Sequence, residues 1–252
     1  ILVAVRGDES GWIALEQALM VAHREQARLQ GLHVVPNAEQ TAHPDARAIQ
    51  EIFERRCTEA GVQGRLAFDV GPVHRKICDR ARWTDLVVTS LNYPPMPGPM
   101  SKMASGIVAL IRRCPRPVLI VPDEPSPLQR ALLAYDGTPK AREALFVATY
   151  LAGRWRIPLT LITVEDGEAD RDDIMEDARR YLEAHGVEAT LAPERRIGGE
   201  TVADAILRYA AADDSDLILM GGYGMGPVVE AVIGSTVDRV LRKSTRPLLI
   251  CR

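Results

Sequence analysis

Glycine is dense in the stretch from Met220 to Ser235, which reads MGGYGMGPVVEAVIGS and holds five glycines in sixteen positions. The stretch continues the apolar run DLILM, so it begins where a buried strand is expected to end. Glycine lets the backbone turn sharply and expose its N–H groups, and such loops after a strand often bind phosphate. The first chemistry that these residues suggest is the binding of a phosphorylated small molecule.

Neither of the two best-known phosphate loops matches this stretch. A Walker loop requires G-x-x-x-x-G-K-[ST], and no lysine precedes Ser235. A Rossmann fingerprint requires G-x-G-x-x-G after the first strand of its unit. Gly222 and Gly224 have the first spacing, but Pro227 stands at the third glycine position, and the preceding strand is the fourth of its unit.

The stretch instead has two anchor points. Gly221 and Gly224 would turn the backbone and expose N–H groups, and Gly234 would let a ligand approach the start of the last helix. Ser235 and Thr236 offer N–H groups at that helix N-terminus, where the helix dipole favours anions. These parts suit polyphosphate binding without a lysine.

A purely structural interpretation is equally open. Ser235 and Asp238 match the capping-box pattern S-x-x-D, so Ser235 would simply cap the helix. A glycine-rich segment after a buried strand also makes a turn without any ligand. Residue types alone leave the two interpretations balanced.

The sequence contains the same unit twice. ILVAVRGDESGWIALEQAL (1–19) aligns with ALLAYDGTPKAREALFVAT (131–149), TDLVVTS (84–90) with SDLILMG (215–221), and LIRRCPRPVLIV (110–121) with VLRKSTRPLLIC (240–251). The pairs keep their order along the chain. We therefore predict two tandem domains, residues 1–124 and 128–252, joined by the proline-containing linker PDEPSPLQR (122–130).

Each copy alternates short apolar runs with longer amphipathic ones, which predicts βαβ units and a mostly parallel sheet. Each domain is expected to be a doubly wound, Rossmann-like α/β sandwich with five strands. The predicted strands of the second copy are 131–135, 159–164, 188–192, 216–220 and 247–251, and its helices are 138–153, 170–185, 200–211 and 235–243. The predicted strands of the first copy are 1–5, 31–35, 63–68, 85–89 and 117–121.

The order of these strands decides where a ligand would bind. If the first strand is central, with the second and third on one side and the fourth and fifth on the other, the ligand crevice lies between the first and fourth strands. In the second copy the first strand ends at Asp136 and the fourth at Met220. The glycine-rich stretch then starts at the expected crevice.

Composition excludes several classes of function. The net charge of −3 and the 5% aromatic content argue against nucleic-acid binding. The four cysteines show no C-x-x-C spacing and the five histidines are scattered, which argues against zinc and disulfides and predicts a cytoplasmic protein. No apolar run is long enough to span a membrane and no signal peptide is visible. The acidic run 165–177 has Arg171 where a calcium loop needs glycine, so no metal site is predicted.

The pattern G-x-x-G-(nine residues)-G-[ST] after the fourth strand, together with D-G-T after the first, resembles the nucleotide-binding universal stress protein family. The resemblance covers nearly the whole chain as two tandem domains. It implies a cytoplasmic α/β protein of the stress response that often dimerises through its last strands. It also implies ATP as the ligand, with Mg²⁺ as a companion ion left open, although some members lack the motif and do not bind ATP.

The resemblance carries over to the second copy residue by residue. Asp136 matches the acidic residue on the adenosine side, and Val164 the residue whose backbone meets the adenine. Val237 departs from the small or hydroxylated residue of many ATP-binding members. The loop and phosphate contacts are matched by Met220, Gly221, Gly224, Gly234, Ser235 and Thr236. An Asx turn with Gly137 is the alternative for Asp136.

The first copy departs from this pattern. Arg6 stands where Asp136 stands, Ser90 and Tyr93 replace the two loop glycines, and Ala104 replaces Gly234. The loop between them carries four prolines, which remove backbone donors. We expect the first domain to keep the fold without nucleotide binding. A different, acidic ligand at Arg6 is the alternative to a surface role for that arginine.

The two copies also suggest an internal pseudo-dimer, in which RPVLIV (116–121) and RPLLIC (246–251) pair antiparallel, because exposed apolar edge strands are avoided. A further homodimer and an unidentified protein partner remain open. No catalytic residue is predicted, since no nucleophile elbow occurs and no histidine neighbours the glycine-rich stretch. At most, slow ATP hydrolysis is expected.

Three functions remain in competition. The leading one is an ATP- or adenine-nucleotide-binding regulatory protein of the universal stress type. The second is a nucleotide-independent interaction module, for example part of a larger transporter, because the chain starts at Ile1 directly in an apolar run. The third, an adenylating enzyme of the related α-hydrolase group, is disfavoured because YDGTPK and VRGDES replace the first-strand loop S-G-G-x-D-S.

Overall fold

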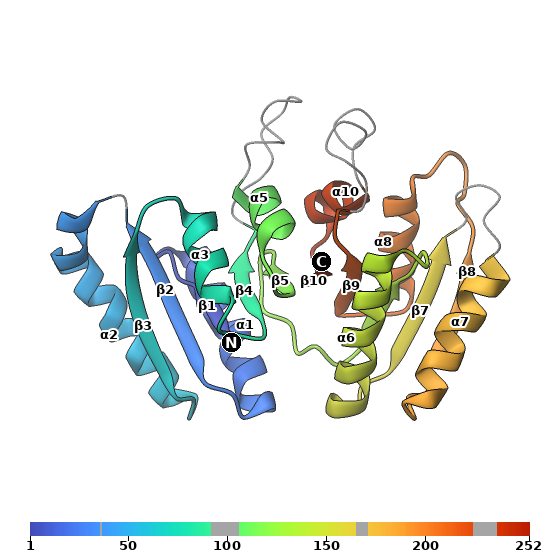
Figure 1. Cartoon of the computed structure of the whole chain (residues 1–252), viewed down its shortest axis with the longest axis horizontal. Coiled ribbons are helices and arrows are strands. Elements are labelled where there is room, and N and C mark those ends of the chain that lie inside the picture. Colours follow the sequence, from blue (N-terminus) through green and yellow to red (C-terminus); the bar gives the residue numbers. More distant parts are fainter. Residues whose placement is uncertain (36, 92–105, 165–170, 224–235) are drawn as a thin grey trace. The chain divides into compact units, whose positions relative to one another are not determined.

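The computed structural model describes residues 1–35, 37–91, 106–164, 171–223 and 236–252. Its contacts divide the chain into two compact units, one formed by the chain up to Pro125 and one running from Ser126 to Arg252. Each unit is an α/β layer structure with helices packed on a parallel sheet (Figure 1). The predicted fold class is therefore confirmed.

The second unit contains a five-stranded parallel sheet in the order β10-β9-β6-β7-β8. Its first strand is central, as the crevice argument requires. Its elements are β6 (Ala131–Ala134), α6 (Pro139–Trp155), β7 (Leu159–Val164), α7 (Arg171–Ala184), β8 (Thr190–Glu194), α8 (Val202–Ala212), β9 (Leu217–Gly221), α10 (Thr236–Lys243) and β10 (Leu248–Cys251).

The first unit repeats this plan, with the strand order β3-β2-β1-β4-β5 and parallel neighbours throughout. Its elements are β1 (Leu2–Ala4), α1 (Glu9–Glu25), β2 (Leu29–Val35), η1 (Ala38–Ala42), α2 (Pro44–Glu59), β3 (Gly64–Val70), α3 (Val73–Ala81), β4 (Val87–Ser90), α5 (Gly106–Arg113) and β5 (Val118–Val121).

The inner strands are buried because their side chains are apolar on both faces, as parallel strands covered by helices require. In the second unit Leu132, Leu133, Leu161 and Ile162 are all fully buried. One helix layer contains α6, which packs over β6, β9 and β10, and α8 packs against α10. The core therefore lies between the sheet and its helices, and the loops begin at the strand ends, outside this core.

The helix ends repeat between the two units as well. Both α1 and α6 end at a residue in the left-handed conformation, Gln26 with φ 53° and Arg156 with φ 54°. Each of these helices also begins with a side-chain cap, Asp8 for α1 and Thr138 for α6. The duplication seen in the sequence thus extends to the backbone conformation of the helix termini.

The third strand of the second unit lies two residues later than predicted, at Thr190–Glu194 instead of 188–192. The predicted strand ended one residue before Pro193, and proline cannot donate to a sheet ladder. In the structure β8 is an edge strand in its unit, with β7 as its neighbour, and Pro193 pairs with Thr163. An edge strand tolerates proline, because one side of the strand needs no donor.

None of the helices in the described part of the chain is long and apolar enough to cross a membrane.

The segment that enters the second unit is tied down by one carboxylate. Asp216 accepts hydrogen bonds from the backbone N–H groups of Gln129 and Arg130, both at 2.8 Å. Its own carbonyl oxygen accepts from the hydroxyl of Ser126 at 2.9 Å. The start of β6 is thereby held beside the start of β9, which Asp216 immediately precedes.

We expect Asp216→Ala to lower the free energy of unfolding of the second unit by about 1–3 kcal/mol, because two backbone donors lose a charged acceptor. Urea unfolding followed by circular dichroism measures this. Asp123→Ala removes an exposed carboxylate from the linker and serves as the control. Equal stabilities of the two variants would contradict the role assigned to Asp216.

Candidate functional site

The carboxyl ends of β6 and β9 meet at the same edge of the second sheet. The two strands pair in parallel, with Ala134 opposite Met220. Asp136 follows β6 by two residues, and Gly221 ends β9. Val164 is the last residue of β7, the other neighbour of β6. The fold thus brings four of the predicted site residues to neighbouring strand ends.

Asp136 is exposed and takes part in a turn. Its Oδ1 accepts a hydrogen bond from the backbone N–H of Thr138 at 3.0 Å. Gly137 has φ +74°, and Thr138 in turn caps α6 by accepting from the N–H of Ala141 at 3.3 Å. The Asx turn that was the structural alternative for Asp136 is therefore present, and it presents the carboxylate to solvent at the strand edge.

Gly221 has a packing role that residue type alone did not reveal. A Cβ atom at this position would lie 2.8 Å from the backbone nitrogen of Ala141 and 2.9 Å from the carbonyl carbon of Lys140. The end of β9 therefore passes directly against the first turn of α6. Glycine is required here for close backbone approach, whatever the loop binds.

Three of the predicted site residues, Gly224, Gly234 and Ser235, lie outside the described residues. Thr236 is the first residue of α10 and is half-buried. Val237, which departs from the family pattern, is buried with 4% exposure. Its apolar side chain is thus used in packing. Because β9, α10 and β10 form a parallel crossover, α10 begins at the same sheet edge as Asp136 and Gly221.

Sequence reasoning missed the contact that ties the start of the glycine-rich stretch to this helix. The hydroxyl of Tyr223 donates to Oδ1 of Asp238 at 2.5 Å, and the Tyr223 side chain is buried. The signal available in the sequence was an aromatic residue, Tyr223, inside a glycine-rich run. The contact also gives Asp238 a role in addition to the capping box that was predicted for it.

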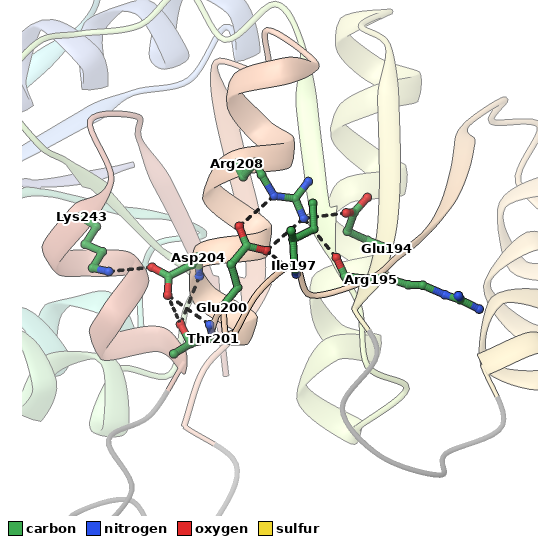
Figure 2. Close-up of polar contacts among 8 residues, drawn as sticks. All are labelled: Glu194, Arg195, Ile197, Glu200, Thr201, Asp204, Arg208 and Lys243. Carbon is green, nitrogen blue, oxygen red and sulfur yellow. Dashed lines mark hydrogen bonds and ion pairs between the residues drawn. The ribbon is translucent and has the colours of Figure 1, made fainter.

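The connection from β8 to α8 is organised by Arg208, as Figure 2 shows. Its guanidinium group donates to Glu194 at 2.7 Å and to Glu200 at 2.9 Å, and it also reaches the carbonyl oxygen of Arg195 at 3.1 Å. The hydrogen bond from Arg208, with one from the amide of Ile197, lowers the pKa of Glu200. One arginine thus joins the strand end, the loop and the helix.

The Arg195 side chain points away from this group of charges (Figure 2). Its backbone, by contrast, is held by Arg208. Arg195 and Arg196 both lie in the connection between β8 and α8, which begins at the carboxyl edge of the sheet.

A second polar group fixes α8 against α10. Thr201 and Asp204 form a reciprocal capping box at the start of α8, and Lys243 near the end of α10 donates to Asp204 at 2.6 Å. The Lys243 ammonium group, followed by the hydroxyl and amide of Thr201, lowers the pKa of Asp204 well below its usual range. The helix whose N-terminus faces the candidate site is thus anchored through its other end.

No group of three His, Cys, Asp or Glu side chains in the described ranges is arranged to hold a metal ion. Near the strand edge, the buried hydroxyl of Thr163 at the end of β7 has no hydrogen-bond partner within the part of the chain that the structure describes. In the first unit, Arg6 follows β1 and forms an ion pair with Asp8 at 3.4 Å, and Ser90 at the end of β4 is buried.

Comparison with known proteins accounts for this duplicated architecture. The model of the universal stress protein family matches the chain twice, over residues 1–122 and 127–252. The chain belongs to the universal stress protein family.

Individual universal stress proteins show the same relationship. Universal stress protein Slr1230 from Synechocystis sp. PCC 6803 is 33% identical over 165 residues, which is 62% of this chain and 55% of the relative. The chain thus spans about half the length of that protein. The solved structure of a universal stress protein from Archaeoglobus fulgidus DSM 4304 superposes with a TM-score of 0.75. The match covers 100% of this chain and 96% of that protein's chain, at 20% sequence identity.

A further solved structure is a universal stress protein from Archaeoglobus fulgidus in complex with dAMP. It is 19% identical, covers 49% of this chain and 98% of its own, and has a TM-score of 0.39. The bound dAMP describes that protein alone.

For this universal stress protein we expect Gly221→Ala to lower the free energy of unfolding by about 1–3 kcal/mol, because the new methyl group overlaps the backbone of α6. Gly153→Ala lies within α6, where a Cβ would meet only Val187 at an ordinary 3.5 Å. That control is expected to be neutral or to stabilise by up to about 1 kcal/mol. Thermal and urea unfolding compare the two variants, and a neutral Gly221→Ala would contradict the close approach.

The ion pair of Asp204 with Lys243 predicts a pH dependence. A carboxylate whose pKa is lowered in the folded state contributes stability above its unfolded pKa of about 3.9 and loses it as the pH falls towards the folded pKa. Lys243→Met should therefore make the acid-side loss of stability below about pH 4 shallower. Arg242→Met removes a neighbouring exposed charge and should leave that slope unchanged. Identical slopes for the two variants in urea unfolding at several pH values would argue against this assignment.

Proposed function

We propose that this universal stress protein is a regulatory protein that binds an adenine nucleotide, in the first place ATP, in its C-terminal domain, residues 128–252. The observation that carries the proposal is the pairing of β6 with β9. It sets an exposed carboxylate, Asp136, beside Gly221 and the start of the glycine-rich stretch. In a doubly wound sheet, this point between the first and fourth strands is where ligands bind.

Each part of the nucleotide has a matching group at this edge. The Asp136 carboxylate is an acceptor for hydroxyl groups on the adenosine side, and the backbone at Val164 would meet the adenine. Gly221 and Gly224 would line the ribose and phosphates with Met220. The N-terminus of α10, with Gly234, Ser235 and Thr236, would hold the phosphates through backbone N–H groups and the helix dipole. Mg²⁺ would accompany the phosphates as a counterion.

The N-terminal domain, residues 1–124, is proposed to be a degenerate copy without nucleotide. Arg6 replaces the acceptor at Asp136 with a cation, and this arginine is already paired with Asp8. A buried Ser90 occupies the position of Gly221. The proposal therefore assigns one nucleotide to each chain.

Regulation is favoured over turnover as the role of the bound nucleotide. Asp136 is the acid that the proposal places on the adenosine side of the nucleotide, and its Oδ1 is engaged in the Asx turn. Occupancy would instead alter the surface read by a protein partner, because the site lies where loops and the start of α10 meet. We propose a cytoplasmic location, in keeping with four cysteines that are all free thiols.

The test is equilibrium binding of ATP, with and without Mg²⁺, by isothermal titration calorimetry. We expect one site per chain and a loss of at least ~10-fold in affinity, about 1.4 kcal/mol, for Asp136→Ala. Asp136→Asn keeps an acceptor for the Asx turn and separates the loss of charge from the loss of the turn. Glu188→Ala removes an exposed carboxylate just before β8, near the opposite edge of the sheet, and should bind as the parent protein does.

Two outcomes would overturn the proposal. One is the absence of saturable binding at millimolar ATP with Mg²⁺, which would favour a nucleotide-independent interaction module. The other is unchanged affinity in Asp136→Ala, which would place the nucleotide elsewhere in the protein.

A further inference from the structure

The N-terminal domain contains a cavity of about 590 Å³. It lies at the carboxyl ends of β1, β2 and β4, where these strands meet the starts of α3 and α5. This is the place in the first domain that corresponds to the proposed nucleotide site in the second. The volume falls within the roughly 300–1,000 Å³ of typical small-molecule sites.

Most of the cavity wall is apolar. Val34 and Val35 contribute from β2, Ile77 from α3, and Ile107 and Leu110 from α5. Four of these five side chains belong to the buried core, and Val34 is half-buried. At roughly 30 Å³ for each heavy atom, the share of a water molecule in the liquid, the cavity has room for a ligand of roughly 20 heavy atoms.

The polar side chains that line the cavity are basic or neutral. Arg6 lines it from the end of β1, with His33 from β2 and His74 from α3. The Nδ1 atom of His33 lies 2.8 Å from the carbonyl oxygen of Val5, so Nδ1 carries the hydrogen and donates. Thr89, from β4, adds a hydroxyl group to the wall.

The charge near His74 is positive. Burial lowers the pKa of the His74 imidazole, and the nearby guanidinium groups of Arg113 and Arg75 lower it further. Asp8 provides a compensating charge, since it pairs with Arg6 at 3.4 Å. A ligand group that enters between Arg6 and His74 therefore meets a region that favours an anion.

The start of α3 adds to this preference. The first two residues of the helix, Val73 and His74, both line the cavity, and the residue before them is Pro72. A proline side chain has no acceptor for the N–H groups of a first helical turn. In the second domain the corresponding helix, α8, has its N-terminus closed by the capping box of Thr201 and Asp204. The N-terminus of α3 thus presents amides and the positive end of a helix dipole to the cavity.

We propose that this cavity binds a small amphipathic carboxylate, such as a medium-chain fatty acid, with the carboxylate towards Arg6 and the start of α3 and the apolar chain against Ile77, Ile107 and Leu110. The wall offers too few polar partners for a nucleotide. Where Asp136 supplies an acceptor in the second domain, the first domain has the cation Arg6. The two domains would then bind ligands of different chemical classes in equivalent places. This inference does not depend on nucleotide binding by the C-terminal domain.

Sodium decanoate, kept below its micelle-forming range, is the probe for the full chain. We expect saturable binding of one decanoate per chain by isothermal titration calorimetry. Decyltrimethylammonium has the same apolar chain with the opposite charge and should show no saturable binding. The ring C–H resonances of His33 and His74, identified with His33→Gln and His74→Gln, should shift with decanoate, whereas that of His185, which directly follows α7, should not.

Two variants locate the site. Arg6→Glu reverses the charge and should weaken decanoate binding at least ~10-fold, and Val34→Phe fills part of the cavity from a half-buried position and should weaken it by a similar factor. Arg65→Glu is the matched charge reversal, since Arg65 is exposed and lies towards the amino end of β3. It should leave the affinity within about twofold of the parent. Circular dichroism and melting temperatures check that each variant is folded.

Any of four results would overturn the proposal. These are no saturable decanoate binding, equal binding of the cationic amphiphile, a shift of the His185 resonance in place of the other two, or affinities that both Arg6→Glu and Val34→Phe leave unchanged. If one of the two variants fails to fold, the other decides.

Discussion

The parallel pairing of the first strand with the fourth is the constraint on which the rest of the protein depends. In the C-terminal domain β6 lies between β7 and β9, so the chain must leave the first strand in one direction and return on the other side. Two connections therefore diverge at one edge of the sheet. Asp136 and Gly221 are neighbours because of that divergence, although 85 residues separate them in sequence. The close passage of Gly221 over Ala141 shows how tightly the two connections are packed.

The two domains share one fold but carry different residues at the carboxyl edge of the sheet. In one domain the edge has an exposed carboxylate and glycine, and the neighbouring helix α8 is closed by Thr201 and Asp204. In the other, Arg6 takes the place of the carboxylate, Pro72 leaves the start of α3 without a side-chain cap, and an apolar cavity lies beneath. Duplication of a domain thus keeps the hydrophobic core, which the fold needs, while the residues at strand ends are free to change.

Much of the fold could be predicted because apolar runs and their spacing recur along the chain. The five strands of each unit were predicted, and the structure has them. The central position of the first strand, which the sequence argument assumed, is also observed. The predicted range of β8 was wrong by two residues and left out Pro193. A proline is tolerated there because β8 is an edge strand of its unit, and the position of the edge is a property of the whole sheet. The Asx turn at Asp136 was anticipated from D-G-T, since its hydrogen bond joins residues two apart.

By itself, the sequence determined the duplication, the α/β class and the residues at the ends of β6 and β9, because these depend on local patterns and on polar groups that the core excludes. Only the tertiary structure showed that Gly221 faces the backbone of α6, that Tyr223 bonds Asp238, and that Arg208 joins β8 to α8. It alone revealed the cavity beside Arg6. Such features depend on the distance between side chains from different elements, and that distance is set by how helices pack on the sheet, which no local pattern encodes.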